Sequence, residues 1–259
     1  MIQPNKILIF DICGQFAHFR KYYTNASSLS YSAPPRTVIA GLIAGVLGIE
    51  RDEYYDVLNT ENTRIAVAIK SGFRKIMQTV NYSNTKTWNF AGNPQQVNLE
   101  IIVPVEKENI RYRVFFYNQN YIDILSEQLI KKKYVYNPYL GISEFLSDIE
   151  YIDCIDETRI ERLNESNKTS VITTCFPKEL ILNIDFSKMP QFLVEKMPVN
   201  FKNIGDNKRN LYKFADYVYS IKKNIPLFCY LKEDSEAYKI SYNYNNSYID
   251  ENIIFMEPK

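Results

Sequence analysis

Short apolar runs alternate with helically spaced apolar positions over residues 1–157. Residues 5–13 are apolar and rich in β-branched side chains, which predicts a buried strand. Residues 35–47 place apolar side chains three and four positions apart, which predicts a helix. Pro35 suits the first helical position, because its missing N–H would have no partner there. Residues 63–70 alternate between faces and predict a second strand.

A second half of the same pattern follows. Residues 99–105 and 110–117 predict strands, residues 121–132 predict a helix, and a strand is expected near 147–156. A short acidic helix is also expected near 51–58. The order β-α-β-(insertion)-β-α-β predicts an α+β, ferredoxin-like (RRM-like) fold, in which two helices cover one face of an antiparallel sheet. That fold hosts many functions and does not identify one.

The insertion and the C-terminal part depart from this order. Residues 71–98 are polar with scattered aromatics, which predicts a protruding hairpin. After residue 157 the pattern is less regular, with strand candidates at 180–186, 211–221 and 237–244. We therefore predict a core over residues 1–157, including the insertion at 71–98, and a β-rich extension over residues 158–259.

Composition excludes several classes of protein and site. Hydrophobic residues make up 46% of the chain and the net charge is +1, which is typical of a globular protein. The four cysteines are far apart and His18 is the only histidine, so neither a metal site nor a cofactor is expected. Phosphate-binding glycine motifs are absent. No apolar run is long enough for a bilayer and no signal peptide is visible, so we expect a cytoplasmic protein without a membrane partner.

Charge is distributed unevenly along the chain. Residues 1–99 carry 10 basic and 6 acidic side chains, whereas residues 100–259 carry 21 basic and 24 acidic ones. No acid lies between Glu61 and Glu100. Because phosphate affinity depends on the local field, this basic N-terminal part is where a polyanion would bind.

Basic and aromatic residues that suit single-stranded RNA are concentrated in two segments. Cations hold phosphates and aromatic rings stack on bases. One segment is the long loop of residues 14–33 with the start of the helix, and the other is residues 70–90. Since the chain has 21 tyrosines, some of these rings could equally belong to the core. The RNA-binding candidates are His18, Phe19, Arg20, Lys21, Tyr22, Tyr23, Tyr31, Arg36, Lys70, Arg74, Lys75, Tyr82, Lys86 and Trp88.

His18 also leaves an enzymatic alternative open. An imidazole with a pKa near neutrality can act as a general acid or base in RNA cleavage, together with Lys21 or a nearby tyrosine. A histidine that is hydrogen-bonded to backbone after the first strand, or that contacts RNA passively, is the favoured interpretation. We therefore predict no catalytic residue.

Three sequence blocks resemble one CRISPR-associated family. The first comprises G-Q-F-A-H-F-R, S-L-S-Y-S-A-P-P-R-T and I-A-G-L-I-A-G-V-L-G within residues 14–48. The second is Y-N-P-Y-L-G-I-S-E-F at residues 136–145, and the third is E-K-M-P-V-N-F near residue 200. In this order they resemble the RAMP-superfamily subunit of type I Cascade that binds the crRNA 5′ handle, the fifth Cas-protein family. The third block is similar to the type I-B branch.

The resemblance implies a function and partners. In that family a ferredoxin-like core and a protruding thumb hairpin grip the 5′ handle, and residues 71–98 correspond to the thumb by position. Gly141, in the second block, joins the RNA-binding candidates on this basis. The family subunit contacts the large subunit and the first backbone subunit, and reaches target DNA only indirectly or weakly.

One branch of the family, in type I-C systems, cuts precursor crRNA with a tyrosine and an adjacent Lys-His pair. This chain has no Lys-His pair. The resemblance therefore favours a non-catalytic RNA-binding subunit. Two alternatives stay open at this point: a metal-independent endoribonuclease, and an interaction scaffold without RNA contact.

Overall fold

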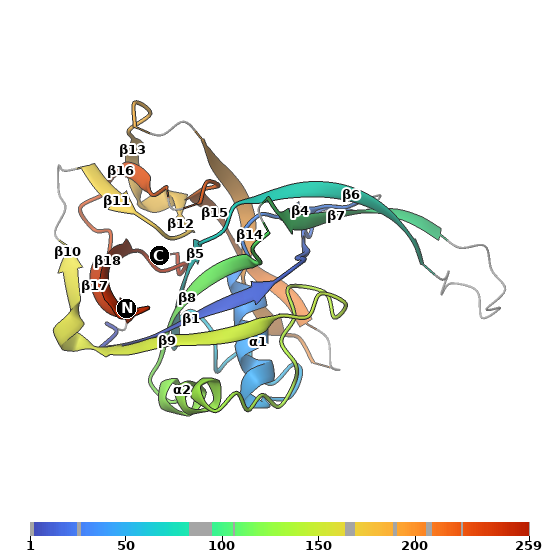
Figure 1. Cartoon of the computed structure of the whole chain (residues 1–259), viewed down its shortest axis with the longest axis horizontal. Helices are drawn as coiled ribbons and strands as arrows, with labels where there is room; N and C mark the ends of the chain where they lie inside the picture. Colours follow the sequence, from blue (N-terminus) through green and yellow to red (C-terminus); the bar gives the residue numbers. More distant parts are fainter. Residues whose placement is uncertain are drawn as a thin grey trace.

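An antiparallel sheet with two helices forms the centre of the computed structural model (Figure 1). The structure describes residues 3–24, 27–82, 95–105, 107–163, 169–188, 191–205, 209–223 and 225–258. The strand order is β5-β8-β1-β9, and each neighbouring pair is antiparallel. The bounds are β1 (Lys6–Gly14), α1 (Arg36–Leu47), β5 (Thr63–Ile69), β8 (Ile110–Asn118), α2 (Ile122–Ile130) and β9 (Asp148–Asp156).

These six elements follow the β-α-β-β-α-β order that the sequence predicts. Both helices lie on the same side of the sheet in Figure 1. The prediction of an α+β fold, here mostly β with two helices in the described residues, is confirmed. None of these helices is long and apolar enough to cross a membrane.

Both faces of the central sheet are covered, which explains the unbroken apolar run of β1. Leu8 and Phe10 pack into the core under the helices. Ile7 and Ile9 point to the opposite face, where a second core forms against β17 (Ala237–Tyr244) and β18 (Ser247–Ile253). A strand buried on both faces has no need of polar alternation.

Helix α1 begins one residue later than predicted. Pro35 is its N-cap, with φ −58° and ψ 154°, and the helix starts at Arg36. Gly48 ends it in the left-handed region, at φ 77°. The acidic helix predicted near 51–58 is wrong: this segment forms turns. Asp52 has a φ of 71°, which a right-handed helix cannot include, and its carboxylate accepts a hydrogen bond from Tyr55.

The predicted hairpin is present and longer than expected. Strand β6 (Phe73–Tyr82) pairs with β7 (Gln95–Pro104) from Phe73 opposite Pro104 to Tyr82 opposite Gln95. The strand predicted at 99–105 is therefore the returning arm of the hairpin. Figure 1 shows this ribbon projecting away from the body. Residues 83–94, with the RNA candidates Lys86 and Trp88, lie outside the described residues.

Short strands occupy the C-terminal part and the N-terminal loop. The predicted strands at 180–186, 211–221 and 237–244 correspond to β13, β15 and β17. Met197 of β14 and Tyr217 of β15 pack in the core under α1. The segments before and after residue 157 therefore share one core. The domain boundary after residue 157 stays a prediction. The bounds are β2 (Phe19–Arg20), β3 (Ser27–Ser28), β4 (Ser30–Tyr31), β10 (Ile160–Leu163), β11 (Thr169–Ile172), β12 (Phe176–Pro177), β13 (Ile181–Ile184), β14 (Phe192–Asn203), β15 (Arg209–Ser220) and β16 (Leu227–Leu231).

Candidate nucleic-acid interface

The loop after β1 is fastened to the base of the projecting hairpin. Ala17 and Ile102 exchange two backbone hydrogen bonds, with N···O distances of 3.1 and 2.9 Å. Strand β3 adds to β7 in parallel, and β2 pairs with β4 within the loop. These bonds hold a loop with little regular structure in one conformation beside the hairpin.

His18 supports this loop from inside. Its side chain is buried, and Nδ1 lies 2.7 Å from the carbonyl oxygen of Glu100, to which it must donate. In a neutral ring Nε2 then accepts from the Ser28 hydroxyl, 2.8 Å away. Burial lowers the pKa of His18 below its ordinary value of 6.5, which favours this neutral form. The geometry is that of the hydrogen-bonded histidine favoured from the sequence.

Glu100 and Lys75 fix the other arm of the loop. The Ser30 N–H donates to Glu100 Oε2 at 2.8 Å, and Lys75 Nζ donates to the Ser30 carbonyl at 2.5 Å. The two side chains also form an ion pair at 3.2 Å. The charge of Lys75 is therefore paired within the protein. Its residue type made Lys75 an RNA candidate, but the sequence does not reveal its pairing with Glu100.

Glu195 fastens the same loop to the hairpin of β14 and β15. Its carboxylate pairs with Lys21 Nζ at 2.7 Å and accepts hydrogen bonds from Tyr219 and from the Ser32 N–H. Tyr31 donates to the carbonyl of Lys196 at 2.7 Å. Glu195 could not be selected from the sequence, because its loop partner Ser32 lies 163 residues away.

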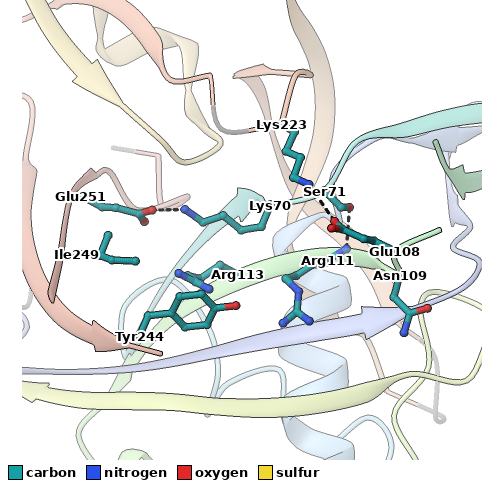
Figure 2. A pocket seen from close by; sticks show the side chains of 10 residues that line it. All are labelled: Lys70, Ser71, Glu108, Asn109, Arg111, Arg113, Lys223, Tyr244, Ile249 and Glu251. Atoms are coloured by element: carbon teal, nitrogen blue, oxygen red, sulfur yellow. Dashed lines mark hydrogen bonds and ion pairs between the residues drawn. The ribbon is translucent and has the colours of Figure 1, made fainter. Parts of the chain in front are cut away.

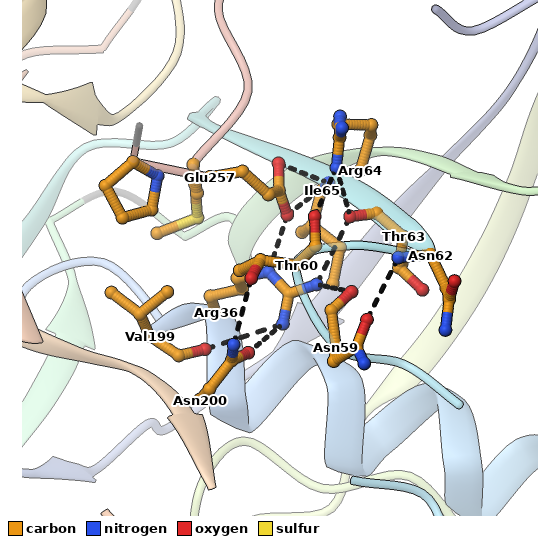
Figure 3. Close-up of polar contacts among 12 residues, drawn as sticks. Arg36, Asn59, Thr60, Asn62, Thr63, Arg64, Ile65, Val199, Asn200 and Glu257 are labelled. Atoms are coloured by element: carbon orange, nitrogen blue, oxygen red, sulfur yellow. Dashed lines mark hydrogen bonds and ion pairs between the residues drawn. The ribbon is translucent and has the colours of Figure 1, made fainter. Parts of the chain in front are cut away.

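Arg36 is not a surface residue (Figure 3). Its guanidinium pairs with Glu257 at 2.5 Å and donates to the carbonyls of Asn59 and Thr63 at 2.8 and 3.3 Å. Both charged side chains are at most 2% exposed. This pair joins α1 to the C-terminal segment.

Four of the RNA candidates are therefore corrected to a supporting role. An RNA contact needs an accessible side chain, and His18, Phe19, Tyr31 and Arg36 are each at most 2% exposed. Their residue types suit RNA, but the fold uses them to pack and brace the loop.

Tyr22, Tyr23 and Phe214 form an aromatic cluster at the surface of this loop region. Tyr22 and Tyr23 are 40% and 53% exposed. The Tyr22 ring lies 5.2 Å from that of Tyr23 and 4.5 Å from that of Phe214 on β15, measured between centroids. Arg20 is exposed on the same loop. Phe214 was not selected from the sequence, because only the tertiary structure brings β15 to the loop.

Among the described residues of the hairpin, two of the candidates are exposed. Arg74 and Tyr82 are exposed along β6. Lys70 lies before the hairpin and pairs with Glu251, which leaves its side chain 13% exposed. The contacts of the candidates with RNA stay predictions.

Gly141 provides a close backbone approach. Its φ is +94°, and a Cβ at this position would lie 1.9 Å from the carbonyl oxygen of His18. The His18 N–H also donates to the neighbouring Leu140 carbonyl at 3.0 Å. The sequence block at residues 136–145 thus contacts the loop at Gly141, where only glycine fits.

Comparison with known proteins finds a family match in the N-terminal part. Residues 7–117 match the model of the family described as CRISPR-associated protein (Cas_Cas5), Cas_Cas5d. A CRISPR protein from Archaeoglobus fulgidus has a similar fold, with a TM-score of 0.53 and 12% identity over 95% of this chain and 99% of that chain. A chain of a CRISPR RNA-guided surveillance complex gives a TM-score of 0.48 and 13% identity over 86% and 90%. No curated protein matches significantly.

The matched residues include β1, the braced loop, α1, the described part of the hairpin and most of β8. They therefore cover most of the elements that build the candidate interface. The subtype I-B assignment stays a prediction. Residues 7–117 match the family model described as CRISPR-associated protein (Cas_Cas5), so this part of the chain is similar to the Cas5 family, as the sequence blocks within residues 14–48 indicate.

Proposed function

We propose that this protein is a non-catalytic crRNA-binding subunit of a type I, I-B-like, CRISPR Cascade. On a ferredoxin-like (RRM-like) core, it holds the 5′ handle of the crRNA. It contacts the large subunit and the backbone subunit, and touches target DNA only indirectly or weakly. A cytoplasmic location in a prokaryote belongs to the same proposal.

The observation that carries the proposal is an exposed aromatic cluster on a rigid support. Tyr22 and Tyr23 present accessible rings, while their loop is held from one side by Glu100 and from the other by Glu195. Single-stranded RNA is bound by such rings, because every base has a face that can stack. Arg20, two positions before Tyr22, is exposed, and Arg74 is exposed on the hairpin, so each can meet a phosphate.

The environment of His18 favours binding over cleavage. Both ring nitrogens already have hydrogen-bond partners inside the protein, and the side chain is 2% exposed. A general base must reach the 2′-hydroxyl that it deprotonates. His18 would have to leave both partners to do so.

The experiment uses the full chain and 5′-labelled repeat RNA in EDTA, on native and denaturing gels. We expect a shift without cleavage, stronger for the handle than for scrambled RNA. Tyr22→Ala and Tyr23→Ala should each weaken binding about tenfold or more, since stacking contributes roughly 1–3 kcal/mol per base. Tyr248→Ala is the matched control, because Tyr248 is 75% exposed on β18, outside the aromatic cluster.

Other outcomes separate the alternatives. Specific cleavage in EDTA that disappears in His18→Gln would establish the endoribonuclease. Equal affinity of the tyrosine variants and the wild type would remove the aromatic cluster from the interface. If the chain binds no RNA either alone or with the large and backbone subunits, the scaffold alternative replaces this proposal.

A further inference from the structure

A polar pocket of about 710 Å³ lies at the base of the projecting hairpin, and none of its lining residues belongs to the aromatic cluster (Figure 2). Residues that precede β6 and follow β7 line it, together with β8 and the β17–β18 pair. Its volume is within the range of pockets that take small ligands. The lining residues are Lys70, Ser71, Glu108, Asn109, Arg111, Arg113, Lys223, Tyr244, Ile249 and Glu251.

Four cations line this pocket against two carboxylates. Arg113 is occupied, because Asp11 and the Tyr242 hydroxyl take its nitrogens and its side chain is 4% exposed. Arg111 and Lys223 are more accessible, with side chains 26% and 34% exposed. Arg111 also pairs with Asp11 at 2.9 Å and with Glu150 at 2.5 Å, and a ligand phosphate would compete with Glu150, whose side chain is 50% exposed. These two are the groups that an anionic ligand would meet.

Glu108 holds the position that a ligand anion would take. Its carboxylate lies 2.9 Å from Lys223 Nζ, and its side chain is 62% exposed. An exposed ion pair contributes little free energy, so a phosphate can displace Glu108 toward solvent.

Glu251 requires a different kind of ligand group. Its side chain is 9% exposed, and Oε1 accepts a hydrogen bond from Lys70. Oε2 is buried and has no hydrogen-bond partner among the described residues. A buried carboxylate oxygen without a donor is costly, so this atom calls for an N–H or O–H from a ligand.

Together these features select a ligand with a phosphate at one end and hydrogen-bond donors at the other. A phosphate dianion alone would not fill the pocket and offers mainly acceptors. We infer that the pocket binds one nucleotide, with its phosphate between Arg111 and Lys223 and a base or ribose donor on Glu251. Arg113 stacks on Tyr244, with 4.3 Å from the guanidinium carbon to the ring centroid, and the pair forms one wall. The nucleotide is either a residue of bound RNA or a free mononucleotide. Only this choice of source rests on the proposed function.

The test titrates the full chain with AMP, adenosine and inorganic phosphate by calorimetry. We expect AMP to bind more tightly than either fragment. Lys223→Gln should weaken AMP about tenfold, because hydrogen bonds to charged groups contribute roughly 1.5–3 kcal/mol. Glu108→Gln should strengthen AMP binding about threefold. Lys239→Gln is the matched control: Lys239 forms an exposed ion pair with Asp250, and neither residue lines the pocket.

Glu251→Gln separates the two ends of the ligand. It should weaken AMP but leave inorganic phosphate unchanged, since only the donor contact is lost. Glu108→Gln keeps the test decisive if Glu251→Gln fails to fold, because Glu108 is on the surface.

The remaining arm identifies the source of the nucleotide. Displacement of bound AMP by handle RNA assigns the pocket to an RNA residue, and simultaneous binding assigns it to a free mononucleotide; both support a nucleotide site. No saturable AMP binding, or AMP affinity equal to that of phosphate and unchanged in Lys223→Gln and Glu108→Gln, would overturn the inference. RNA binding through the aromatic cluster would survive that result, so the two proposals can fail separately.

Discussion

Replacing Arg36 by methionine should destabilise the fold and leave the RNA surface intact. Met keeps much of the aliphatic volume but leaves Glu257 buried without its cation. The Ile65 N–H would still donate to that carboxylate, at 3.1 and 3.2 Å to its two oxygens. The carbonyls of Asn59 and Thr63 would each lose one donor and keep another, the Thr63 N–H for Asn59 and the Arg64 guanidinium for Thr63. Breaking one partner of a buried ion pair costs about 3–5 kcal/mol.

Urea unfolding followed by circular dichroism measures this loss. With an m-value of about 3 kcal/mol per molar, the midpoint should fall by roughly 1–1.5 M. The loss should also depend on pH. Burial already raises the pKa of Glu257 above its ordinary value of 4.5, and removing Arg36 raises it further. The folded variant then holds a proton that the unfolded chain releases, so its deficit grows as pH rises above 4.5 and shrinks at acidic pH.

Two controls make the result specific. Arg51→Met removes an arginine whose side chain is 79% exposed, and its midpoint should move by less than about 0.3 M. The double variant Arg36→Met/Glu257→Met should regain part of the loss, because the carboxylate that Arg36→Met leaves without its partner is also removed. An Arg36→Met protein with wild-type stability and weakened RNA binding would refute the reasoning and restore Arg36 to the RNA interface.

Three further predictions follow from the braced loop and the hairpin. Since burial lowers the pKa of His18 below 6.5, its contribution to stability is complete above pH 6.5 and is lost as pH falls; His18→Gln should flatten that part of the wild-type stability–pH curve, and parallel curves would contradict this. Gly141→Ala should destabilise by about 2 kcal/mol or more, seen in the thermal midpoint, because its Cβ would clash with the His18 carbonyl; a midpoint within a degree of wild type would show that the loop can yield. Arg74→Gln should reduce the slope of log affinity against log salt by about 0.7, and an unchanged slope would remove Arg74 from phosphate contact.

The order of the elements could be predicted from the sequence, because the spacing of apolar residues within a short segment indicates whether that segment is a strand or a helix. The run at residues 5–13, the helical spacing at 35–47 and the polar insertion at 71–98 all correspond to elements of the structure. The helix expected near 51–58 failed because composition does not report that Asp52 adopts a positive φ. The start of α1 moved by one residue because Pro35 is equally compatible with the N-cap.

The accessible part of the candidate site was only partly visible in the sequence. Residue types selected Arg20, Tyr22 and Tyr23 as RNA-binding candidates. The structure leaves these side chains exposed, and their contact with RNA stays a prediction. The same types also selected Tyr31 and Arg36, because tyrosine and arginine serve a buried hydrogen-bond network as well as they serve RNA.

Only the tertiary structure decided which residues are free to bind and which are used as supports. Glu195 reaches the loop from β14, Phe214 reaches it from β15, and Glu257 reaches Arg36 from the C-terminal segment. Partners separated by more than 160 positions in the chain leave no periodic signal in the sequence. By itself, the sequence determined the order of strands and helices in the central sheet and the resemblance to a family over residues 7–117, because both depend on residues close together along the chain. The burial of each charge depends on contacts between distant segments, and these exist only in the folded protein.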